Sequence, residues 1–417
     1  MKIVEKSAPH LRKPNASVVR MMRDVVIALM PLVIFAIYNH GLDAVVILAA
    51  AIGSMVGTEY IYYQIVDYVK RDRTKHEEIK DKIAGFNKQI ETAKAAYQED
   101  SNQELYDETV EKLKAEIRKA KDELRAYKQA STKEENKRFH LFNRNFTLYN
   151  YSILVSGIIF GLTVPDSTHF MIVIIGGVAA TLLVKMIFGG MGQNIFNIAG
   201  FARAFIALGF GAAVGVSNHL PVQDDGSAGA TVLGSLTSNP FTEPSTFSIW
   251  DMFSGIGFPG AIGEASALLI LAGALYMFVR KSFDVFVPLV YVGTVFVLST
   301  AVMVQQDIGW WYPMTHIFSG GLLFGAVFMA TDPITIPVTR PGRVYFAFGL
   351  GVITFVIRLF GQYPEGVVFA ILIMNMFVPA IDYAKWSKNK FSLKSSLIFS
   401  AVILLTIFAV WVGASNV

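Results

Sequence analysis

The chain has 417 residues, of which 53 % are hydrophobic and only 16 % are charged, and it contains no cysteine. This composition indicates a polytopic membrane protein, because an average soluble protein is about 25 % charged. The lack of cysteine excludes disulfides and cysteine-ligated zinc or iron–sulfur sites within this chain, and the net charge of +4, with basic residues matched locally by acidic ones, does not indicate nucleic-acid binding.

Eleven apolar stretches are long enough, at about 17–25 residues, to cross a bilayer as helices. They are residues 24–40, 43–66, 147–164, 168–188, 198–217, 261–279, 285–304, 314–331, 344–361, 366–384 and 395–414. Lys and Arg occur on alternate loops, and the loops without either are 41–42, 165–167, 218–260, 305–313, 362–365 and 415–417. Because Lys and Arg mark cytoplasmic loops, we expect a cytoplasmic N-terminus and an external loop at 218–260. The sequence thus predicts an all-α protein of the inner or plasma membrane with about ten or eleven transmembrane helices.

Spans one to five and spans six to ten form two sets of five, and an odd number of spans per set makes an internal repeat inverted. No convincing sequence identity joins the sets, so two inverted five-helix halves are suggested by topology alone. The expected organisation is an N-terminal tail with two spans (1–66), a charged insert (67–146), spans three to five (147–217), an external loop (218–260), spans six to ten (261–384) and an extra C-terminal span (385–417).

The insert is the most highly charged part of the chain, since residues 67–144 hold 19 of the 36 Lys and Arg and 17 of the 32 Asp and Glu. Apolar residues recur there at alternating spacings of four and three, which is a heptad pattern on each of two helices. The first seam is Ile79, Ile83, Phe86, Ile90, Ala93 and Tyr97, and the second is Tyr106, Val110, Leu113, Ile117, Ala120, Leu124 and Tyr127. We expect a cytoplasmic antiparallel coiled-coil hairpin, which is either a solvated spacer or a docking element for a partner.

Two clusters of small and polar residues interrupt the apolar sequence. The external loop reads DDGSAGAT at residues 224–231, where small residues leave the hydroxyl of Thr231 accessible to a modifying enzyme; a flexible turn explains the same pattern. The inner turn reads GGMGQNIFN at residues 189–197, where Asn194 and Asn197 offer amide groups to a heterocycle; a helix–helix packing turn is the alternative.

Ionisable residues in or beside apolar spans are costly and usually functional. Here they are Glu59, Arg203, Glu264, Asp332, Arg358 and Asp382. Arg203 and Glu264 are candidates for cofactor binding, although they also fit a pair that merely neutralises itself. The three carboxylates toward the inner face, Glu59, Asp332 and Asp382, are candidates for a hard-cation or proton path, and a helix-end charge explains each of them as well.

Together these clusters resemble the RnfD/NqrB family, whose members are membrane subunits of the ion-translocating Rnf and Na⁺-NQR redox complexes. The matching stretches run in family order and cover nearly the whole chain outside the insert and the last span. They are SAPHLRKPNASVVRMMRDVVIAL, KMIFGGMGQNIFNIAGFARAF, DDGSAGATVL, GFPGAIGEASALL, FMATDPITIPVT and PEGVVFAILIMNMFVPAID. The short N-terminus that opens on SAPHLR is more similar to RnfD than to NqrB, which carries a longer extension.

The resemblance implies a flavin electron carrier. In the family, an exported flavin transferase attaches FMN through its phosphate to the Thr of a D-G-x-S/T-G-A-T motif. Here that residue would be Thr231, preceded by Asp225, Gly229 and Ala230. Ala228 departs from the motif, because the family usually has Ser or Thr at this position.

The resemblance also implies a second, non-covalent riboflavin, which NqrB proteins hold near the inner turn and which would here lie close to Asn194 and Asn197. The Asn197-Ile198 pair departs from the usual Asn-Pro. The implied activity is electron transfer between ferredoxin and NAD⁺ coupled to Na⁺ or H⁺ movement, in a complex with iron–sulfur and second flavin-carrying subunits and not by this chain alone. An NqrB-like subunit of a Na⁺-translocating NADH:quinone oxidoreductase and a flavin-free secondary transporter or channel are the alternatives.

Overall fold

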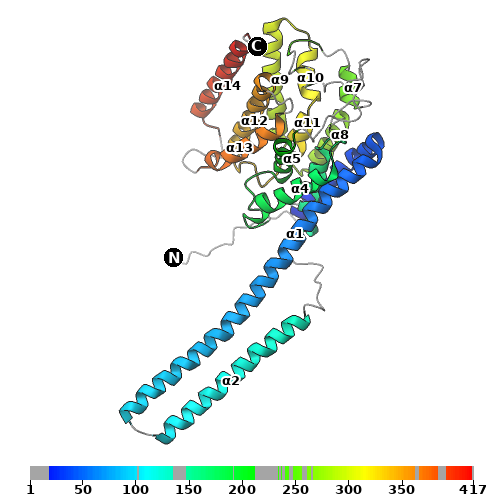
Figure 1. The fold of residues 1–417 in the computed structure, drawn as a ribbon. Coiled ribbons are helices and arrows are strands. Elements are labelled where there is room, and N and C mark those ends of the chain that lie inside the picture. Colours follow the sequence, from blue (N-terminus) through cyan, green and yellow to red (C-terminus); the bar gives the residue numbers. More distant parts are fainter. Residues whose placement is uncertain are drawn as a thin grey trace. The chain divides into compact units, whose positions relative to one another are not determined.

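The structure is a computed structural model that describes residues 18–100, 103–134, 147–190, 192–211, 233, 236, 240–243, 248–255, 261–263, 266–361, 366–383 and 391–415. These residues form helices and turns, and no strand occurs among them. The chain divides into two compact units, which are called here the membrane unit (Met1–Glu59 and Thr147–Val417) and the insert unit (Tyr60–Phe146). Figure 1 shows the helices of both units.

The first helix, α1, runs over Val18–Asp100, and its course changes at Gly41. Gly41 has φ 57° and ψ −132°, a left-handed conformation that a residue with a Cβ rarely adopts. The break falls at the short 41–42 loop that the sequence predicts between the first two spans. Of α1, residues Val18–Val66 are long and apolar enough to cross a membrane.

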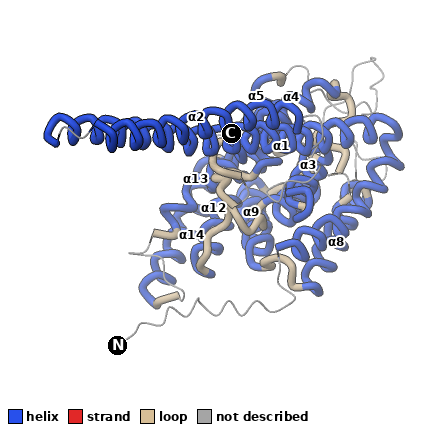
Figure 2. Tube along the Cα trace, turned by 90° about the horizontal axis from the view of Figure 1, so that it is seen from below, coloured by secondary structure: helices blue, strands red, loops and turns tan. Residues whose placement is uncertain are grey.

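The other helices of the membrane unit can be divided by length into long and short ones. Besides Val18–Val66, three helices are long and apolar enough to cross a membrane: α9 (Phe286–Gln306), α12 (Arg340–Phe360) and α14 (Leu393–Ala414). The shorter elements are η1 (Thr147–Asn150), α3 (Ser152–Leu162), α4 (Phe170–Ala180) with η2 (Thr181–Met186), α5 (Ile198–Gly209), α7 (Ile249–Ser254), α8 (Ala267–Arg280), α10 (Trp311–Phe318), α11 (Leu322–Phe324) with η3 (Gly325–Met329), and α13 (Val367–Ile381). Figure 2 shows the helices of this unit packed together as a bundle.

Several expected spans are shorter or more broken than their hydropathy suggests. The stretch 314–331 is interrupted between α10 and α11, where Gly320 and Gly321 have positive φ values of 64° and 68°. The Arg358 side chain donates hydrogen bonds to the carbonyls of His316 and Ser319 over 2.5 and 3.2 Å, and to that of Gly320 over 3.1 Å. A buried guanidinium thus supplies the donors that the end of α10 lacks.

Close packing in the membrane unit depends on small residues, as is usual between membrane helices. A Cβ added to Gly157 would lie 2.9 Å from the Cα of Ile52, and one added to Gly273 would lie 2.9 Å from the carbonyl oxygen of Ala28. In both places the backbone of α1 packs directly against a glycine of a neighbouring helix, Gly157 of α3 and Gly273 of α8.

The last helix, α14, packs against α9 and α12. The Phe399 ring meets Tyr345 and Phe348 at centroid distances of 4.9 and 5.2 Å, and Gln306 Nε2 donates to the Ala414 carbonyl over 2.7 Å. Most of its other apolar side chains are exposed, as expected for a helix with a surface that faces lipid.

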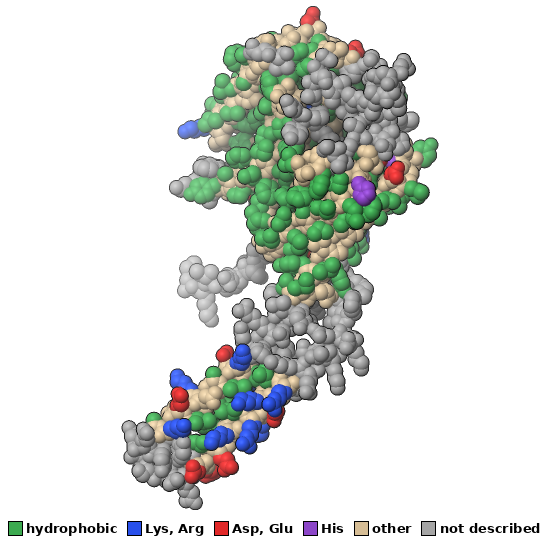
Figure 3. Space-filling view, viewed as in Figure 1, with side chains coloured by type: hydrophobic (Ala, Val, Ile, Leu, Met, Phe, Trp, Pro, Cys, Tyr) green, Lys and Arg blue, Asp and Glu red, His purple; other side chains and the backbone are tan. Residues whose placement is uncertain are grey.

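The insert unit contains the second part of α1 and the helix α2 (Gln103–Glu134). Its buried apolar residues within the described part are Ile79, Val110, Ile117 and Ala120, all members of the two expected seams. In Figure 3, Lys, Arg, Asp and Glu gather over this unit, whereas the visible described face of the membrane unit is mostly hydrophobic. The pairing of the two helices as a coiled coil stays a prediction.

Candidate functional site

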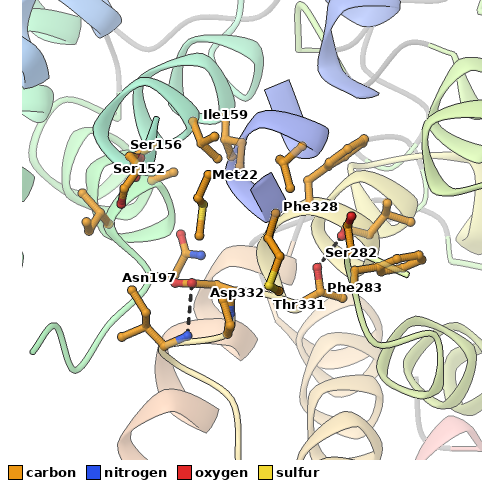
Figure 4. Close-up of a pocket in the computed structure, with 18 of the residues that line it drawn as sticks. Met22, Ser152, Ser156, Ile159, Asn197, Ser282, Phe283, Phe328, Thr331 and Asp332 are labelled. Atoms are coloured by element: carbon orange, nitrogen blue, oxygen red, sulfur yellow. Dashed lines mark hydrogen bonds between the residues drawn. The ribbon is translucent and has the colours of Figure 1, made fainter. Parts of the chain in front are cut away.

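A cavity of about 60 Å³ lies in the membrane unit, between α1, α3, the start of α5 and the segment that follows η3. Its walls are mainly apolar, with Met21, Met22, Val25, Phe283 and Phe328 among them. The polar lining residues are Ser152, Ser156, Asn194, Asn197, Ser282, Thr331 and Asp332. In Figure 4, Asn197 and Asp332 appear on the left of the cavity, and Ser282 and Phe283 on the right. An apolar pocket with a few convergent polar groups is the usual composition of a binding site.

Asn197 stands at the cavity because it caps α5. Its Oδ1 accepts the Gly200 N–H over 2.9 Å, which is the capping bond, and its Nδ2 donates to the Met329 carbonyl over 3.1 Å. Its backbone N–H donates to the Oδ1 of Asn375 over 3.0 Å. The amide of Asn197 therefore already serves the fold, which agrees with the packing-turn interpretation of this segment.

Asn194 lies on the turn between η2 and α5, where three glycines have positive φ: Gly189 (110°), Gly190 (96°) and Gly192 (86°). Such angles require glycine, so the glycine-rich sequence builds the turn itself. The Nδ2 of Asn194 donates to the Phe196 carbonyl over 3.1 Å. The turn thus brings Asn194 and Asn197 to the same cavity with much of their hydrogen-bonding capacity used locally.

Asp332 is the carboxylate that lines the cavity. Its Oδ1 accepts the Ile334 N–H over 3.3 Å, and its Oδ2 accepts the Thr335 hydroxyl over 3.4 Å. Burial raises the pKa of Asp332 to about 6, against the lowering effect of these two donors.

Glu59 belongs to a separate buried cluster. The Lys185 Nζ donates to Glu59 Oε2 over 3.1 Å and to Thr147 Oγ1 over 2.6 Å, and the Thr147 hydroxyl lies 2.9 and 2.8 Å from the two Glu59 oxygens. The backbone N–H of Thr147 also donates to Glu59, over 3.2 Å. Each of the three residues is at most 1 % exposed. Glu59 and Thr147 are also the residues at which the chain leaves and re-enters the membrane unit.

Asp382 follows α13 and accepts the Val338 N–H at both carboxylate oxygens, over 3.2 and 3.0 Å. This contact ties the end of α13 to the segment before α12, as a helix-end charge would. The structure does not bring Glu59, Asp332 and Asp382 into one described cluster.

The expected flavin residues lie mostly outside the described part of the chain. These are Asp225, Gly229, Ala230, Thr231 and Glu264. Arg203 is described and is buried in α5. Leu233 and Leu236 are buried, and the Leu233 side chain fills the place that a Cβ at Gly320 would take.

Sequence reasoning missed Lys185, Thr147 and Asn375. Lys185 lies near the end of the predicted span 168–188, where charge patterning counts it among the Lys and Arg of the inner face, but in the structure it is only 1 % exposed within the π-helix η2. A signal was available, since a buried Glu59 needs a positive partner. Asn375 gives no such signal, because a lone amide in an apolar helix does not reveal its partners.

Comparison with known proteins shows similarity in the sequence before and after the middle of the insert. Residues 4–79 and 137–390 match the model of the NQR2, RnfD, RnfE family. The D subunit of the Na⁺-translocating ferredoxin:NAD⁺ oxidoreductase complex of Acetobacterium woodii is 37 % identical over 244 residues, which are 58 % of this chain and 73 % of that protein. The D subunit of the proton-translocating ferredoxin:NAD⁺ oxidoreductase complex of Clostridium ljungdahlii is 35 % identical over 251 residues, 58 % of this chain and 74 % of that protein. The B subunit of the Na⁺-translocating NADH-quinone reductase of Chromohalobacter salexigens is 34 % identical over 243 residues, 56 % of this chain and 58 % of that protein.

Proposed function

The chain belongs to the NQR2, RnfD, RnfE family, and we propose that it is the membrane electron-transfer subunit of an Rnf-type complex that couples ferredoxin and NAD⁺ redox chemistry to Na⁺ or H⁺ transport. The observation that carries this proposal is the family match over both parts of the membrane unit. Two relatives that are D subunits of ferredoxin:NAD⁺ oxidoreductase complexes, at 37 % and 35 % identity, support the Rnf assignment. An NqrB-like role is the second candidate, favoured by a relative at 34 % identity.

The partners follow from what the chain lacks. Without cysteine it cannot bind an iron–sulfur cluster through thiolates, so any iron–sulfur carriers of the complex would lie on other subunits. We therefore place it beside iron–sulfur and second flavin-carrying subunits in the complex. Alone it is not a complete enzyme.

Family membership suggests a flavin cofactor, and we propose FMN linked to Thr231 by an exported transferase. A bound flavin would exchange electrons singly or in pairs and so connect one-electron with two-electron carriers. Support from the described residues is that Leu233, two positions after Thr231, is buried against Gly320. The attachment sequence therefore adjoins an anchored point of the membrane unit. Asp225, Gly229 and Ala230 would serve recognition by the transferase.

A non-covalent riboflavin beside Asn194 and Asn197 is proposed only for an opened form of the cavity. Pockets for ligands of this size usually have about 300–1,000 Å³, whereas this cavity has about 60 Å³. At this volume the cavity fits a few waters better than a flavin ring. Arg203 and Glu264 stay candidates for a flavin contact.

The ion path is proposed to use Glu59, Asp332 and Asp382. Asp332 has the strongest support, because its carboxylate lines the cavity and burial brings its pKa to about 6. Glu59 is engaged by Lys185, and Asp382 by the Val338 N–H, so each would need a rearrangement before it met a cation.

The proposed orientation has the N-terminus and insert in the cytoplasm and residues 218–260 outside, with two inverted five-helix halves and a coiled-coil insert. Because the chain has no cysteine, single cysteines report on it without background. A cysteine in place of Ser227 should react with an impermeant thiol reagent in intact cells, and one in place of Ser101 should not. The reverse pattern would place the flavin loop inside and refute the attachment proposal.

The flavin itself is tested on a denaturing gel of the purified complex, produced together with the transferase. The band of this chain should fluoresce, Thr231→Ala should abolish the fluorescence, and Ser227→Ala should keep it. Fluorescence that survives Thr231→Ala would move the attachment site. A wild-type band without fluorescence would mean that Ala228 disables the motif.

A further inference from the structure

Two hydrogen bonds join a pair of buried asparagines to the segment that carries Asp332, and a third joins the asparagines to each other. The Nδ2 of Asn197 donates to the Met329 carbonyl over 3.1 Å, and the Nδ2 of Asn375 donates to the Thr335 carbonyl over 3.1 Å. The backbone N–H of Asn197 donates to the Oδ1 of Asn375 over 3.0 Å. The two asparagines therefore form one connected clamp, here called the asparagine clamp, on both ends of the segment.

The bonds within the segment transmit this clamp to Asp332. The Asp332 N–H donates to the Met329 carbonyl over 3.4 Å, and the Thr335 N–H donates to the Asp332 carbonyl over 3.2 Å. The Thr335 hydroxyl donates to the Asp332 carboxylate over 3.4 Å. Met329 and Thr335 are thus both the clamped residues and the neighbours that set where the carboxylate lies.

The segment needs an external clamp because its own backbone offers few hydrogen bonds. It follows the π-helix η3, whose last carbonyls have no partner within the helix. Pro333 has no N–H to donate. The clamp residues instead stand on regular helices, Asn197 as the cap of α5 and Asn375 within α13, and they are 5 % and 1 % exposed. At such burial a lost partner leaves an unsatisfied polar group, so the clamp favours a single arrangement.

We infer that Asn375 is a positioning residue for the proposed ion path, which fixes the Asp332 carboxylate at the cavity wall without lining the cavity itself. Asn375 is not among the described residues that line the cavity, whereas Asn197 and Asp332 are. The inference rests on the proposed role of Asp332. It assigns Asn375 an effect on cation dependence and none on flavin content.

The position of residue 332 is tested first, without reference to activity. In the assembled complex, an Asp332→Cys reporter is labelled with a membrane-permeant maleimide, with and without Asn375→Leu. Release of the clamp should change the labelling rate by at least about threefold. Ser299→Ala is the matched control, because the Ser299 hydroxyl is buried and bonds only to carbonyls of its own helix among the described residues. An equal labelling rate with and without the clamp overturns the inference.

The second measurement uses the native carboxylate. Asn375→Leu should raise the Na⁺ concentration for half-maximal turnover about tenfold, or shift the pH midpoint if protons are carried, while the covalent flavin content stays at the wild-type level. If Leu lowers assembly, Asn375→Ala decides instead, since it removes the donor to Thr335 and the acceptor for Asn197 without adding bulk or charge. Unchanged Na⁺ dependence and pH midpoint in an assembled variant overturn the inference. If Asp332→Asn leaves the cation dependence intact, the ion path fails, and the labelling rate still reports on the clamp.

Discussion

Two Lys–Glu pairs of this chain have similar geometry and opposite surroundings. In the membrane unit, the Lys185 Nζ lies 3.1 Å from Glu59 Oε2, with side chains 1 % and 0 % exposed. In the insert unit, the Lys112 Nζ lies 2.6 Å from Glu108 Oε1, with side chains 74 % and 63 % exposed. Water screens the second pair and is excluded from the first, so only the first leaves an uncompensated charge when one partner is removed. The two units therefore depend on their charges for different reasons.

The pKa values of two carboxyl groups, Asp332 in the membrane unit and Glu108 in the insert unit, are shifted in opposite directions. Burial raises the pKa of Asp332 to about 6, while the hydrogen bond from Lys112 lowers the pKa of Glu108. Asp332 is only half-buried by exposed surface, and its pKa nevertheless lies nearer to neutral pH than that of Glu108. On the proposed ion path, Asp332 of the membrane unit would therefore carry the titration, and Glu108 of the insert unit would not.

The largest effect is expected from Lys185→Met. This change leaves Glu59 buried without a positive partner, which typically costs about 3–5 kcal/mol. The yield of folded protein and its thermal midpoint after extraction in detergent should both fall strongly. A second change, Glu59→Gln, should restore part of the loss, because no buried charge then remains. A thermal midpoint equal to that of the wild type would mean that water reaches the cluster.

The next effect is expected from Ile117→Asn in the insert unit. Ile117 is 8 % exposed, and replacing it with a polar side chain removes apolar burial at a cost of about 2–4 kcal/mol. Proteolysis or hydrogen exchange within residues 103–134 should accelerate, and the flavin signal of the membrane unit should not change. Arg118→Asn, at the exposed neighbouring position, is the control. Equal protection in both variants would contradict the predicted seam.

These contrasts also mark what the sequence could predict. Periodicity identifies the apolar face of α2, because Val110, Ile117 and Ala120 recur at the spacing of helix turns. The break at Gly41 is visible because a short loop separates two apolar runs. The interruption before α11 is not visible, since hydropathy averages over it and the donors come from Arg358, far along the chain.

The candidate site also has a part that the sequence could predict and a part that it could not. Asn194, Asn197 and Asp332 are recognisable from their motifs, and the structure places all three around one cavity. Their hydrogen bonds are not recognisable, because Asn375 and Met329 are remote in sequence and unremarkable in type. Hydrogen bonds between residues far apart in sequence produce no periodic pattern. The motif residues could therefore be found from the sequence, whereas their hydrogen-bond partners could not.

A smaller effect concerns the pH dependence of cation-coupled turnover. Because the pKa of Asp332 is raised to about 6, the side chain is charged above that pH and neutral below it. Turnover limited by cation binding should be half-maximal near pH 6 and about tenfold below its plateau one pH unit lower. Asp332→Asn should remove this midpoint, and Glu108→Gln in the insert should keep it. A midpoint that persists in Asp332→Asn would assign the titration to another group.

The smallest effect is expected from Lys112→Ala. Both members of the Glu108 pair are mostly exposed, and Ala is a better helix former than Lys, so the lost ion pair is partly offset. The thermal midpoint of the insert unit should move by less than about 2 °C, with the difference smaller still at high salt. The measurements are the thermal midpoint and the hydrogen-exchange protection of α2, each in the isolated chain and in the assembled complex. A loss as large as that of Ile117→Asn in the isolated chain would contradict the exposed-pair interpretation. If the loss appears only in the complex, the pair is buried there against a partner, and the insert then acts as a docking element and not as a solvated spacer.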